Sequence, residues 1–330
     1  MNDEAAVMDR PEALEKKTPK ASRWTNTLFG NATSLSALLT FGLLFAIMVA
    51  LLMDATPALS KYGLSFLSSD IWDPVSETFG GLPSIYGTLV TAAIAMLLGV
   101  PTAFGIAIFI TELCPPVARE PLRIAIELLA GIPSIIYGMW GLLVFGPFFG
   151  EVVSPMVQNT LGQIPGLGRL FEGPPIGIGL LPAGIILAIM VIPFISSVMR
   201  EVFVLVPGVL RESAFALGAT TWEVLWRVIL PYSRAGVIGG IILGLGRALG
   251  ETMAVTFVVG NAHEIPWSIL MPGTTISATI ANEYAEATGE LHTSALIALG
   301  LILFLITTVV LAFAQFMLYQ LEKGRGRENA

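Results

Sequence analysis

The sequence is poor in charge. Only 12% of its 330 residues are Asp, Glu, Lys or Arg, whereas 55% are hydrophobic and the mean hydropathy is +0.79. Soluble domains carry about 25% charged residues, so this chain has roughly half the charge needed to cover a water-facing surface. A soluble enzyme, a disordered protein and a nucleic-acid-binding protein are therefore excluded, and the net charge of -7 would in any case repel DNA.

Residues and motifs of metal, redox and nucleotide chemistry are also scarce. The single cysteine, Cys114, cannot form an intramolecular disulfide, and two histidines leave little room for a His-ligated metal. The chain has no Gly-Lys pair, and hence no phosphate-binding P-loop, and it has no Gly-x-Ser-x-Gly elbow. We therefore expect no catalytic residues, no metal and no cofactor. If the chain takes part in active transport, another subunit must supply the energy.

Long apolar runs are abundant. Six stretches reach the length of about 20 residues that a helix needs to cross a bilayer core, and backbone groups in lipid must be paired within the segment, which favours helices. They cover residues 35–53, 85–110, 126–149, 176–198, 235–259 and 294–318. The sequence thus predicts an all-α integral membrane protein with six transmembrane helices. We interpret residues 35–53 as a retained anchor, because the polar stretch before it is too long for a signal peptide.

The positive charges predict the orientation. Lys and Arg are enriched on the cytoplasmic side of membrane proteins. Fourteen of them lie in the two tails and in the loops after the second and fourth spans, against two, Lys61 and Arg169, on the other side. We therefore expect both termini in the cytoplasm, with residues 1–34 and 319–330 as cytoplasmic tails and residues 54–84 as an outer segment.

The loop between the fourth and fifth spans carries the strongest local signals. Pro207 breaks the incoming helix, and residues 209–217 have helical character. Gly218 can end that helix in the left-handed conformation, and Thr220 or Thr221 can cap the next one. The loop is thus predicted to form two short helices.

The second of these helices is predicted to be apolar on one side and to be closed by Pro231. The helical spacing would place four side chains on one stripe, namely Trp222, Leu225, Trp226 and Ile229. Such a helix can dock in a groove of a partner protein, or it can lie in the membrane interface, where tryptophan is enriched. The pattern alone leaves both interpretations open.

The same loop resembles the EAA loop of ABC-importer permeases, in which Glu-Ala-Ala is followed after three residues by Gly and after nine more by Ile-x-Leu-Pro. The spacing is kept here, with Ser213 in place of Ala and Val228 in place of Ile. In that family the loop is the coupling helix that sits in a cleft of the ATPase subunit, so the resemblance favours docking. The residues that it assigns to ATPase coupling are Glu212, Ser213, Ala214, Gly218, Trp222, Trp226, Leu230 and Pro231.

Other stretches resemble the phosphate permeases of the PstC type. They are Trp72-Asp73-Pro74, where we would expect Asn in place of Asp73, followed by FGGLPSIYGTL at 79–89, LAGIPSIIYGMWG at 129–141 and GRALGETMAV at 246–255. Related permeases for sulfate, molybdate or phosphonate share the EAA loop, so the choice of phosphate rests on these stretches.

The resemblance covers residues 35–318 and implies an architecture and a set of partners. Residues 85–318 would form a type I importer permease core of the MetI-like kind, with the coupling loop at about 206–231. The chain would span the bacterial inner membrane several times and would contact membrane lipid. Its partners would be a homologous permease subunit of the PstA type, an ATPase dimer and a periplasmic phosphate-binding protein, which also holds the affinity for phosphate.

The fifth span contains a charged pair. Arg247 and Glu251 are four residues apart, which would place them on one helical face, and charges within a membrane normally face protein or water. We expect this face to contact a second permease subunit, with Arg247, Glu251 and the adjacent Thr252 lining the substrate pathway. Glycines precede the pair at steps of four residues and would let another helix approach closely, at Gly236, Gly240 and Gly244.

The pair has two interpretations. In the first, Arg247 offers a planar and permanently charged fork to phosphate oxygens, and Glu251 neutralises it when the pathway is empty. In the second, the two residues form a fixed clamp that holds the helix packing.

Two other functions are alternatives to the importer. A self-sufficient channel or secondary transporter would need inverted repeats, which are not visible, and a membrane-embedded enzyme would have only this pair to use.

Overall fold

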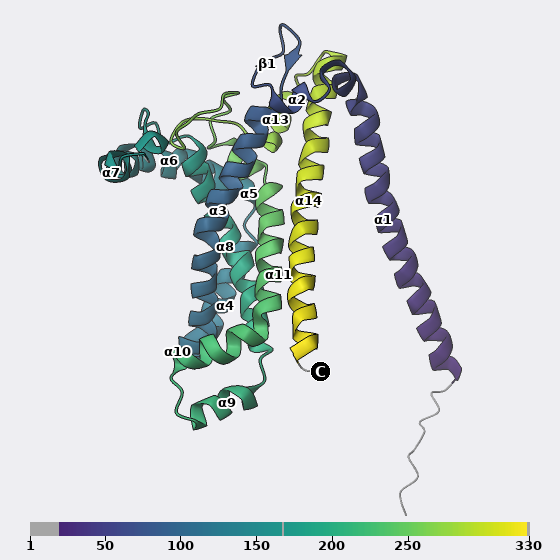
Figure 1. The fold of residues 1–330 in the computed structure, drawn as a ribbon, viewed down its shortest axis with the longest axis vertical. Coiled ribbons are helices and arrows are strands. Elements are labelled where there is room, and N and C mark those ends of the chain that lie inside the picture. Colours follow the sequence, from purple (N-terminus) through teal and green to yellow (C-terminus); the bar gives the residue numbers. More distant parts are fainter. Residues whose placement is uncertain (1–19, 167, 329–330) are drawn as a thin grey trace, which may run out of the picture. The chain divides into compact units, whose positions relative to one another are not determined.

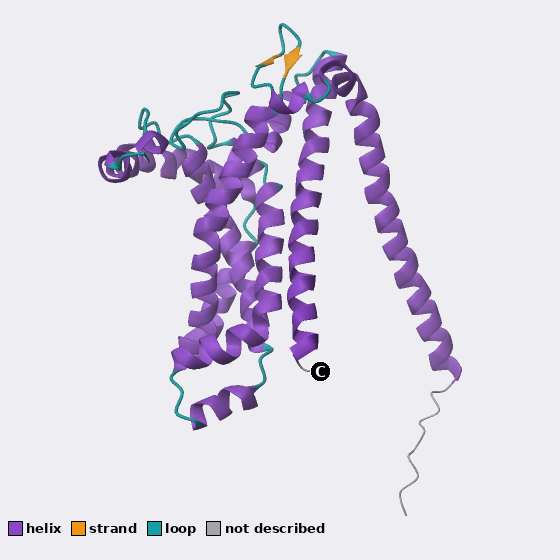
Figure 2. Cartoon of the chain, in the orientation of Figure 1, coloured by secondary structure: helices purple, strands orange, loops and turns teal. Residues whose placement is uncertain are grey.

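The computed structural model describes residues 20–166 and 168–328, which are helical over most of their length (Figure 2). Residues 1–19 of the expected N-terminal tail lie outside the described part. Within it, six helical segments are long and apolar enough to cross a membrane, as the sequence predicts. Their bounds are Thr27–Tyr62, Leu82–Leu113, Ser134–Gln163, Leu180–Val204, Thr221–Leu249 and Glu290–Gln320.

The chain divides into two compact units, residues 1–50 and 51–330. Helix α1 (Lys20–Tyr62) begins in the first unit and ends in the second. Between residues 27 and 50 its side chains, mostly Leu, Phe, Ala and Thr, are exposed almost without exception. An apolar helix with no buried face is typical of a segment surrounded by lipid.

In the second unit, the last turns of α1 contain a proline that interrupts the helical hydrogen bonds. Pro57 has no N–H to donate. Ser294 of α14 (Glu290–Glu328) reaches into the neighbouring turn, where its Oγ donates to Asp54 O at 2.8 Å and accepts from Ala58 N at 3.0 Å. A side chain inserted in this way stabilises the bend, and it ties the end of α1 to α14.

A small cap follows α1, at the end of the bundle opposite the loop between the fourth and fifth spans (Figure 1). We name these two ends outer and inner after the orientation that the basic residues predict. The outer cap contains α2 (Ser65–Ser68) and an antiparallel hairpin of β1 (Trp72–Asp73) and β2 (Thr78–Phe79), in which Trp72 lies opposite Phe79. The rings of these two residues are 5.0 Å apart and pack edge to face. They belong to a buried cluster that also includes side chains of α13 (Ile276–Glu283) and α14. The expected outer segment, residues 54–84, is therefore largely structured.

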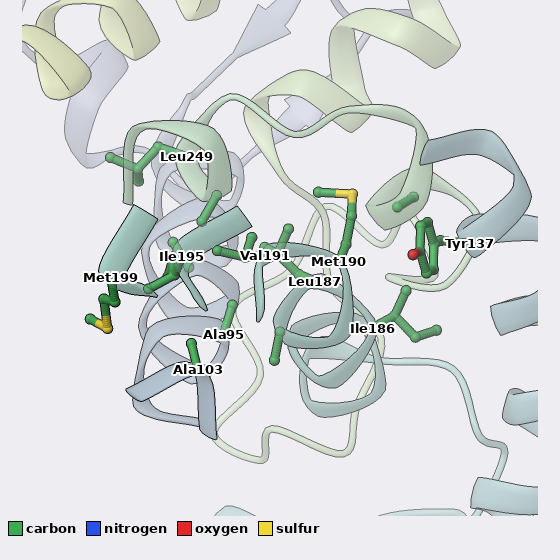
Figure 3. Packing of buried hydrophobic residues seen from close by; sticks show 14 of the residues in the cluster. Ala95, Ala103, Tyr137, Ile186, Leu187, Met190, Val191, Ile195, Met199 and Leu249 are labelled. Carbon is green, nitrogen blue, oxygen red and sulfur yellow. The ribbon is translucent and has the colours of Figure 1, made fainter. Parts of the chain in front are cut away.

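The main core lies between α3 (Leu82–Ile108) and α8 (Leu180–Val204), which share the most extensive helix contact. Figure 3 shows Val191 and Ile195 of α8 inside the cluster with Ala95 and Ala103 of α3. The alanines are small, so they let the two helices approach closely. Helix α11 (Leu230–Leu249) packs against both α8 and α3 and contributes Leu249 to the same cluster.

The remaining elements are short, and several are joined by wide π-helical turns. They are the π turn Phe109–Leu113, α4 (Pro116–Ala130), α5 (Ser134–Trp140), the π turn Gly141–Phe145, α6 (Gly146–Phe148), the π turn Phe149–Val153, α7 (Ser154–Thr160), the 3-10 turns Leu161–Gln163 and Gly168–Phe171, α9 (Gly208–Ala216), α10 (Thr221–Val224), the π turn Leu225–Ile229 and α12 (Met253–Thr256).

Two of the predicted spans have wrong bounds. The stretch 126–149 is not one helix, because α4 ends at Ala130 and α5 begins at Ser134, with Pro133 in an extended conformation between them. The third apolar segment therefore starts at Ser134 and continues through π turns to Gln163. The stretch 235–259 is also broken, because α11 ends at Leu249 before Gly250, and glycine is a poor helix former.

A buried seam of hydroxyl groups joins the start of α3 to residues 274–279. Ser84 and Thr279 share a hydrogen bond of 3.0 Å, and Thr88 Oγ1 accepts from Ile276 N at 2.9 Å. Gly87 lies so close to Thr274 that any Cβ at position 87 would overlap with the Thr274 carbonyl oxygen. The outer end of α3 is thus fixed by backbone contact as well as by hydrogen bonds.

Candidate coupling loop and substrate pathway

The loop after α8 forms the two short helices that its sequence predicts. Helix α9 is followed by Gly218, whose φ of 85° is in the left-handed region where glycine is favoured. Thr220 then caps α10 in a capping box, since its hydroxyl accepts from Glu223 N and the Glu223 carboxylate accepts from Thr220 N. Figure 1 places α9 and α10 at the end of the bundle where the C-terminal part of α14 also lies.

The predicted apolar stripe on the second helix is wrong. Leu225 and Ile229 are buried in the main core, whereas Trp222 and Trp226 are 64% and 43% exposed. The π turn Leu225–Ile229 also departs from the regular helical spacing on which the prediction rests, because it takes up one residue more than an α-helical turn. The two indole rings lie 5.4 Å apart on the outside of the loop.

Pro231 does not close the helix as predicted. It lies in the first turn of α11, directly after the π turn Leu225–Ile229, and the helical segment continues through it. The loop and the fifth span therefore form one helical segment, Thr221–Leu249, with a π turn but no break. Helices α10 and α11 are thus joined without an intervening loop.

The loop leaves several large apolar side chains exposed, and its polar residues are partly exposed as well. Glu212 and Ser213 are exposed on α9, whereas Ala214 and Leu230 are half-buried and Pro231 is exposed. A hollow of about 360 Å³ lies between the two helices and is lined partly by Ala214, Gly218 and Val228. Large apolar side chains with at least two-fifths of their surface exposed are Val209, Leu210, Phe215, Leu217, Trp222 and Trp226. Exposed apolar side chains gathered on one loop are typical of a surface that binds a partner.

Arg247 and Glu251 do not share a helical face. Arg247 is in the last turn of α11, but Glu251 lies beyond the helix end, where its Oε1 accepts a hydrogen bond of 3.2 Å from Ala254 N at the start of α12. Among the described residues, no ion pair joins the two. The Glu251 carbonyl accepts from Ser277 Oγ at 3.0 Å, so the turn is also held from α13. The adjacent Thr252 is half-buried.

Arg247 is exposed, and its guanidinium carbon lies 6.0 Å from the centre of the Phe194 ring on α8. Its position at the C-terminal end of α11 is favourable, because the partial negative charge of the helix end attracts a cation. A charge on a membrane helix still costs roughly 2.5–3.5 kcal/mol when it faces lipid. This side of α11 therefore has to be covered by water, by another subunit or by an anion.

The glycines of α11 pack within this chain. A Cβ at Gly236 would overlap with Val202, one at Gly244 would overlap with Ile195, and one at Gly240 would lie 3.2 Å from Val198. All three partners belong to α8. The close approach of two helices is as expected, but the prediction that this face contacts a second permease subunit is wrong.

An outer cluster of polar side chains escaped the sequence analysis. Glu283 Oε1 lies 2.8 Å from His263 Nε2, and its Oε2 lies 2.9 Å from both His292 Nε2 and Trp72 Nε1. The Trp72 and His263 rings are stacked at 5.5 Å. Both histidines of the chain thus meet on one carboxylate, which holds the β-hairpin, α13 and α14 together. No motif spacing links these residues, so only the structure reveals the cluster.

The environment of Glu283 lowers its pKa. Burial by itself raises the pKa of this carboxyl, but the hydrogen bonds from His263, Trp72 and His292 outweigh burial and hold the pKa below its ordinary value of 4.5. The carboxylate is therefore charged over the whole neutral range, and the outer cluster is a stable anchor under those conditions.

Comparison with known proteins agrees with this geometry. Residues 99–321 match the family described as binding-protein-dependent transport system inner membrane component. A protein of Mesorhizobium japonicum named phosphate transport system permease protein PstC is 55% identical over 302 residues, which cover 92% of each chain. Six apolar helices and membership of an inner-membrane transport family make the chain a multi-pass membrane protein.

Two solved structures share the fold. A bacterial alginate ABC transporter in complex with an alginate pentasaccharide-bound periplasmic protein contains a chain with a TM-score of 0.57 and 21% identity, and the match covers 90% of this chain and 96% of that one. An inward-facing MetNI methionine ABC transporter gives a TM-score of 0.52 at 16% identity, with coverage of 72% and 94%. The chain belongs to the binding-protein-dependent inner-membrane transport components and, within them, to the PstC-type permeases.

Proposed function

We propose that the chain is the permease subunit of an ATP-driven importer that carries inorganic phosphate across the bacterial cytoplasmic membrane. The observation that supports this most is the continuity of the segment Thr221–Leu249. One end of this segment is an exposed apolar loop with two tryptophans, and the other end presents Arg247. The substrate is proposed from the 55% identity to a protein named as a phosphate permease.

The coupling loop is the proposed ATPase contact. Glu212, Ser213 and the two tryptophans are exposed, as residues that contact another subunit have to be. Ala214 and Gly218 line the hollow between α9 and α10, while Leu230 and Pro231 join the loop to α11. A separate ATPase dimer would hydrolyse ATP, and its closure would push this loop.

Arg247, Glu251 and Thr252 are the proposed pathway residues. Arg247 is exposed beside the core and forms no ion pair with Glu251 in the described part of the chain. Its guanidinium is therefore available to bind two phosphate oxygens at once. Glu251 holds the turn that follows α11, so in this conformation it shapes the pathway and does not neutralise Arg247.

The remaining partners follow from the same proposal. A homologous permease subunit of the PstA type would cover Arg247, which is exposed at the end of α11 beside Phe194 of α8. A periplasmic phosphate-binding protein would deliver the anion at the outer cap. Both termini would then be cytoplasmic, since fourteen of the seventeen basic residues lie in the tails and in two loops.

Arg247 variants in the reconstituted complex test the proposal. Hydrogen bonds to a charged group contribute about 1.5–3 kcal/mol, so Arg247→Gln should lower phosphate uptake roughly tenfold to a hundredfold while the ATPase still copurifies. Arg247→Lys should be intermediate, because a lysine keeps the charge without the planar fork. Arg169→Gln, which removes an exposed arginine elsewhere, is the matched control.

Three outcomes contradict parts of the proposal. Normal uptake in an assembled Arg247→Gln complex removes the pathway role. Loss of assembly indicates a structural clamp. Uptake that sulfate or molybdate suppresses as strongly as unlabelled phosphate does would overturn the assignment of the substrate.

A further inference from the structure

The arginine that precedes the Glu-Ser-Ala motif forms a contact that the sequence does not indicate. Arg211 extends from α9 into the bundle, where its Nη1 lies 3.2 Å from Glu112 Oε1 and its Nη2 donates to the Phe203 carbonyl at 2.5 Å. Glu112 is in the π turn Phe109–Leu113 at the end of α3, and Phe203 is in the last turn of α8. One guanidinium therefore joins three separate elements.

This contact is well shielded from water. The Glu112 side chain is 8% exposed and that of Arg211 is 22% exposed. A carboxylate at this depth requires a cation, because an unpaired buried charge is strongly unfavourable. Among the described residues, Arg211 is the cation that forms an ion pair with Glu112. Breaking the pair therefore leaves the end of α3 with an uncompensated charge.

The covalent links of α9 are poorly suited to carry a force sideways. The helix is preceded by Pro207 in an extended conformation and followed by Gly218 in the left-handed conformation, so each end is a bend. The segment after Gly218 leads to α11 alone. The Arg211 contact is a polar side-chain link from α9 to the end of α3 and to α8, the two helices with the most extensive packing, and it accompanies the apolar packing of Ala214 against the main core.

We propose that Arg211 and Glu112 are positioning residues, and that their ion pair carries movement of the coupling loop into α3 and α8. This inference rests on the proposed function, because it needs an ATPase that moves α9. In this proposal the two connections of the loop have different roles. Helix α10 moves α11 directly through the continuous segment, and Arg211 moves the other two core helices with it. Without the pair, α11 would slide against α8 and the pathway would not open as a unit.

The guanidinium is required for this role, since its Nη2 donates to the Phe203 carbonyl while its Nη1 forms the ion pair with Glu112. A lysine at position 211 would keep the charge opposite Glu112 but would have one nitrogen to share between both acceptors. Arg211→Lys therefore separates the two roles of the contact. It preserves charge compensation and weakens the mechanical link.

The experiment uses the full complex of permease subunits, ATPase and binding protein in proteoliposomes. For each variant it measures copurification of the ATPase, ATP hydrolysis stimulated by the phosphate-loaded binding protein, and phosphate imported per ATP hydrolysed. In Glu112→Gln we expect the ATPase to copurify and to hydrolyse ATP, while phosphate imported per ATP falls roughly tenfold. Arg211→Lys should give a smaller fall in the same ratio. Glu201→Gln removes an exposed carboxylate at the same end of α8 and should leave the ratio unchanged.

The outcomes are separable. An unchanged ratio in both Glu112→Gln and Arg211→Lys overturns the positioning role. If Glu112→Gln fails to assemble, Arg211→Lys decides alone: a lowered ratio in an assembled complex supports the proposal, and a normal ratio reduces the pair to a structural one. If no ATPase copurifies with the unmodified chain, the proposed function is wrong. This outcome is visible without any variant, so it is distinct from failure of the ion-pair proposal.

Discussion

The two ends of the bundle hold a buried carboxylate in different ways. At the outer end, three donors converge on Glu283 and both carboxylate oxygens are engaged, at distances between 2.8 and 2.9 Å. At the inner end, Glu112 forms one ion pair at 3.2 Å, and neither Glu112 Oε1 nor Arg211 Nε has a hydrogen-bond partner among the described residues. Both oxygens of Glu283 thus accept hydrogen bonds, although His263 Nδ1 is buried without a partner in the described part of the chain, whereas Glu112 is held by its one ion pair.

The difference in hydrogen bonding indicates which end of the bundle can rearrange more easily. A carboxylate whose two oxygens accept three hydrogen bonds resists rearrangement, because a shift of the carboxylate breaks several charge-assisted hydrogen bonds at once. The outer cap is thus a fixed frame for the hairpin, α13 and α14. The inner end depends on fewer contacts, so it can rearrange at lower cost when another subunit pushes the loop.

The largest effect should come from the tryptophans of the inner end. Truncating a tryptophan at the centre of an interface typically costs about 2 kcal/mol, or roughly thirtyfold in affinity. In the double variant Trp222→Ala/Trp226→Ala we therefore expect the ATPase to be lost on copurification. Trp267→Ala is the matched control, because this tryptophan is also exposed, at 86%, but lies on an outer loop. Equal loss of the ATPase in both variants would contradict the assignment of the inner end.

The next largest effect should come from the contact between α11 and α8, which connects the two ends of the bundle. Gly244→Ala would place a methyl group against Ile195 of α8, and overpacking of this kind costs about 1–3 kcal/mol. Gly239→Ala is on the same helix with nothing within 4 Å of its Cβ, so it should be neutral or more stable by up to about 1 kcal/mol. Thermal unfolding of the two purified variants in detergent measures the difference, and equal melting temperatures would exclude the glycine contact.

The smallest effect concerns the outer frame and depends on pH. The folded-state pKa of Glu283 lies below 4.5, so the charged carboxylate contributes stability above that pH, and the contribution is lost as the pH falls through the folded value. Glu283→Gln should therefore lower the melting temperature at pH 7, by the equivalent of about 1 kcal/mol. The gap to the unmodified protein should close in acid.

Glu286→Gln provides the control for this titration, because it neutralises an exposed carboxylate three residues away. It should follow the unmodified protein at every pH. A gap between Glu283→Gln and the unmodified protein that stays constant from pH 7 to a pH below the folded-state pKa of Glu283 would show that the outer frame does not depend on the charge of Glu283.

What the sequence predicts well is local. Gly218 and Thr220 determine the end of one short helix and the start of the next through contacts within a few residues, so the two-helix loop is predictable. Two other features are harder to predict, namely the end of α11 at Leu249 and the π turn Leu225–Ile229. Hydropathy does not indicate where a helix breaks inside an apolar run. For the same reason Glu251 was assigned to a helical face that it does not occupy.

Contacts between distant residues were beyond prediction. Glu112 and Arg211 lie on opposite sides of two spans in the sequence, and the three donors to Glu283 come from three separate segments. No periodicity connects such positions. The glycine steps of α11 did predict a close helix contact, but a repeat of small residues does not say which helix approaches, and the partner is α8 of the same chain.

The contact between Gly87 and Thr274 bears on how the phosphate-permease signature should be understood. Gly87 belongs to FGGLPSIYGTL, one of the stretches by which the chain resembles its relatives, and its neighbours Ser84 and Thr88 are occupied with holding residues 276–279. A substitution at Gly87 would force the Thr274 backbone aside. Variants at position 87 that lose transport would therefore be defective because the protein misfolds. At this position, the stretch by which the chain resembles phosphate permeases reflects the packing of the fold and not a contact with the substrate.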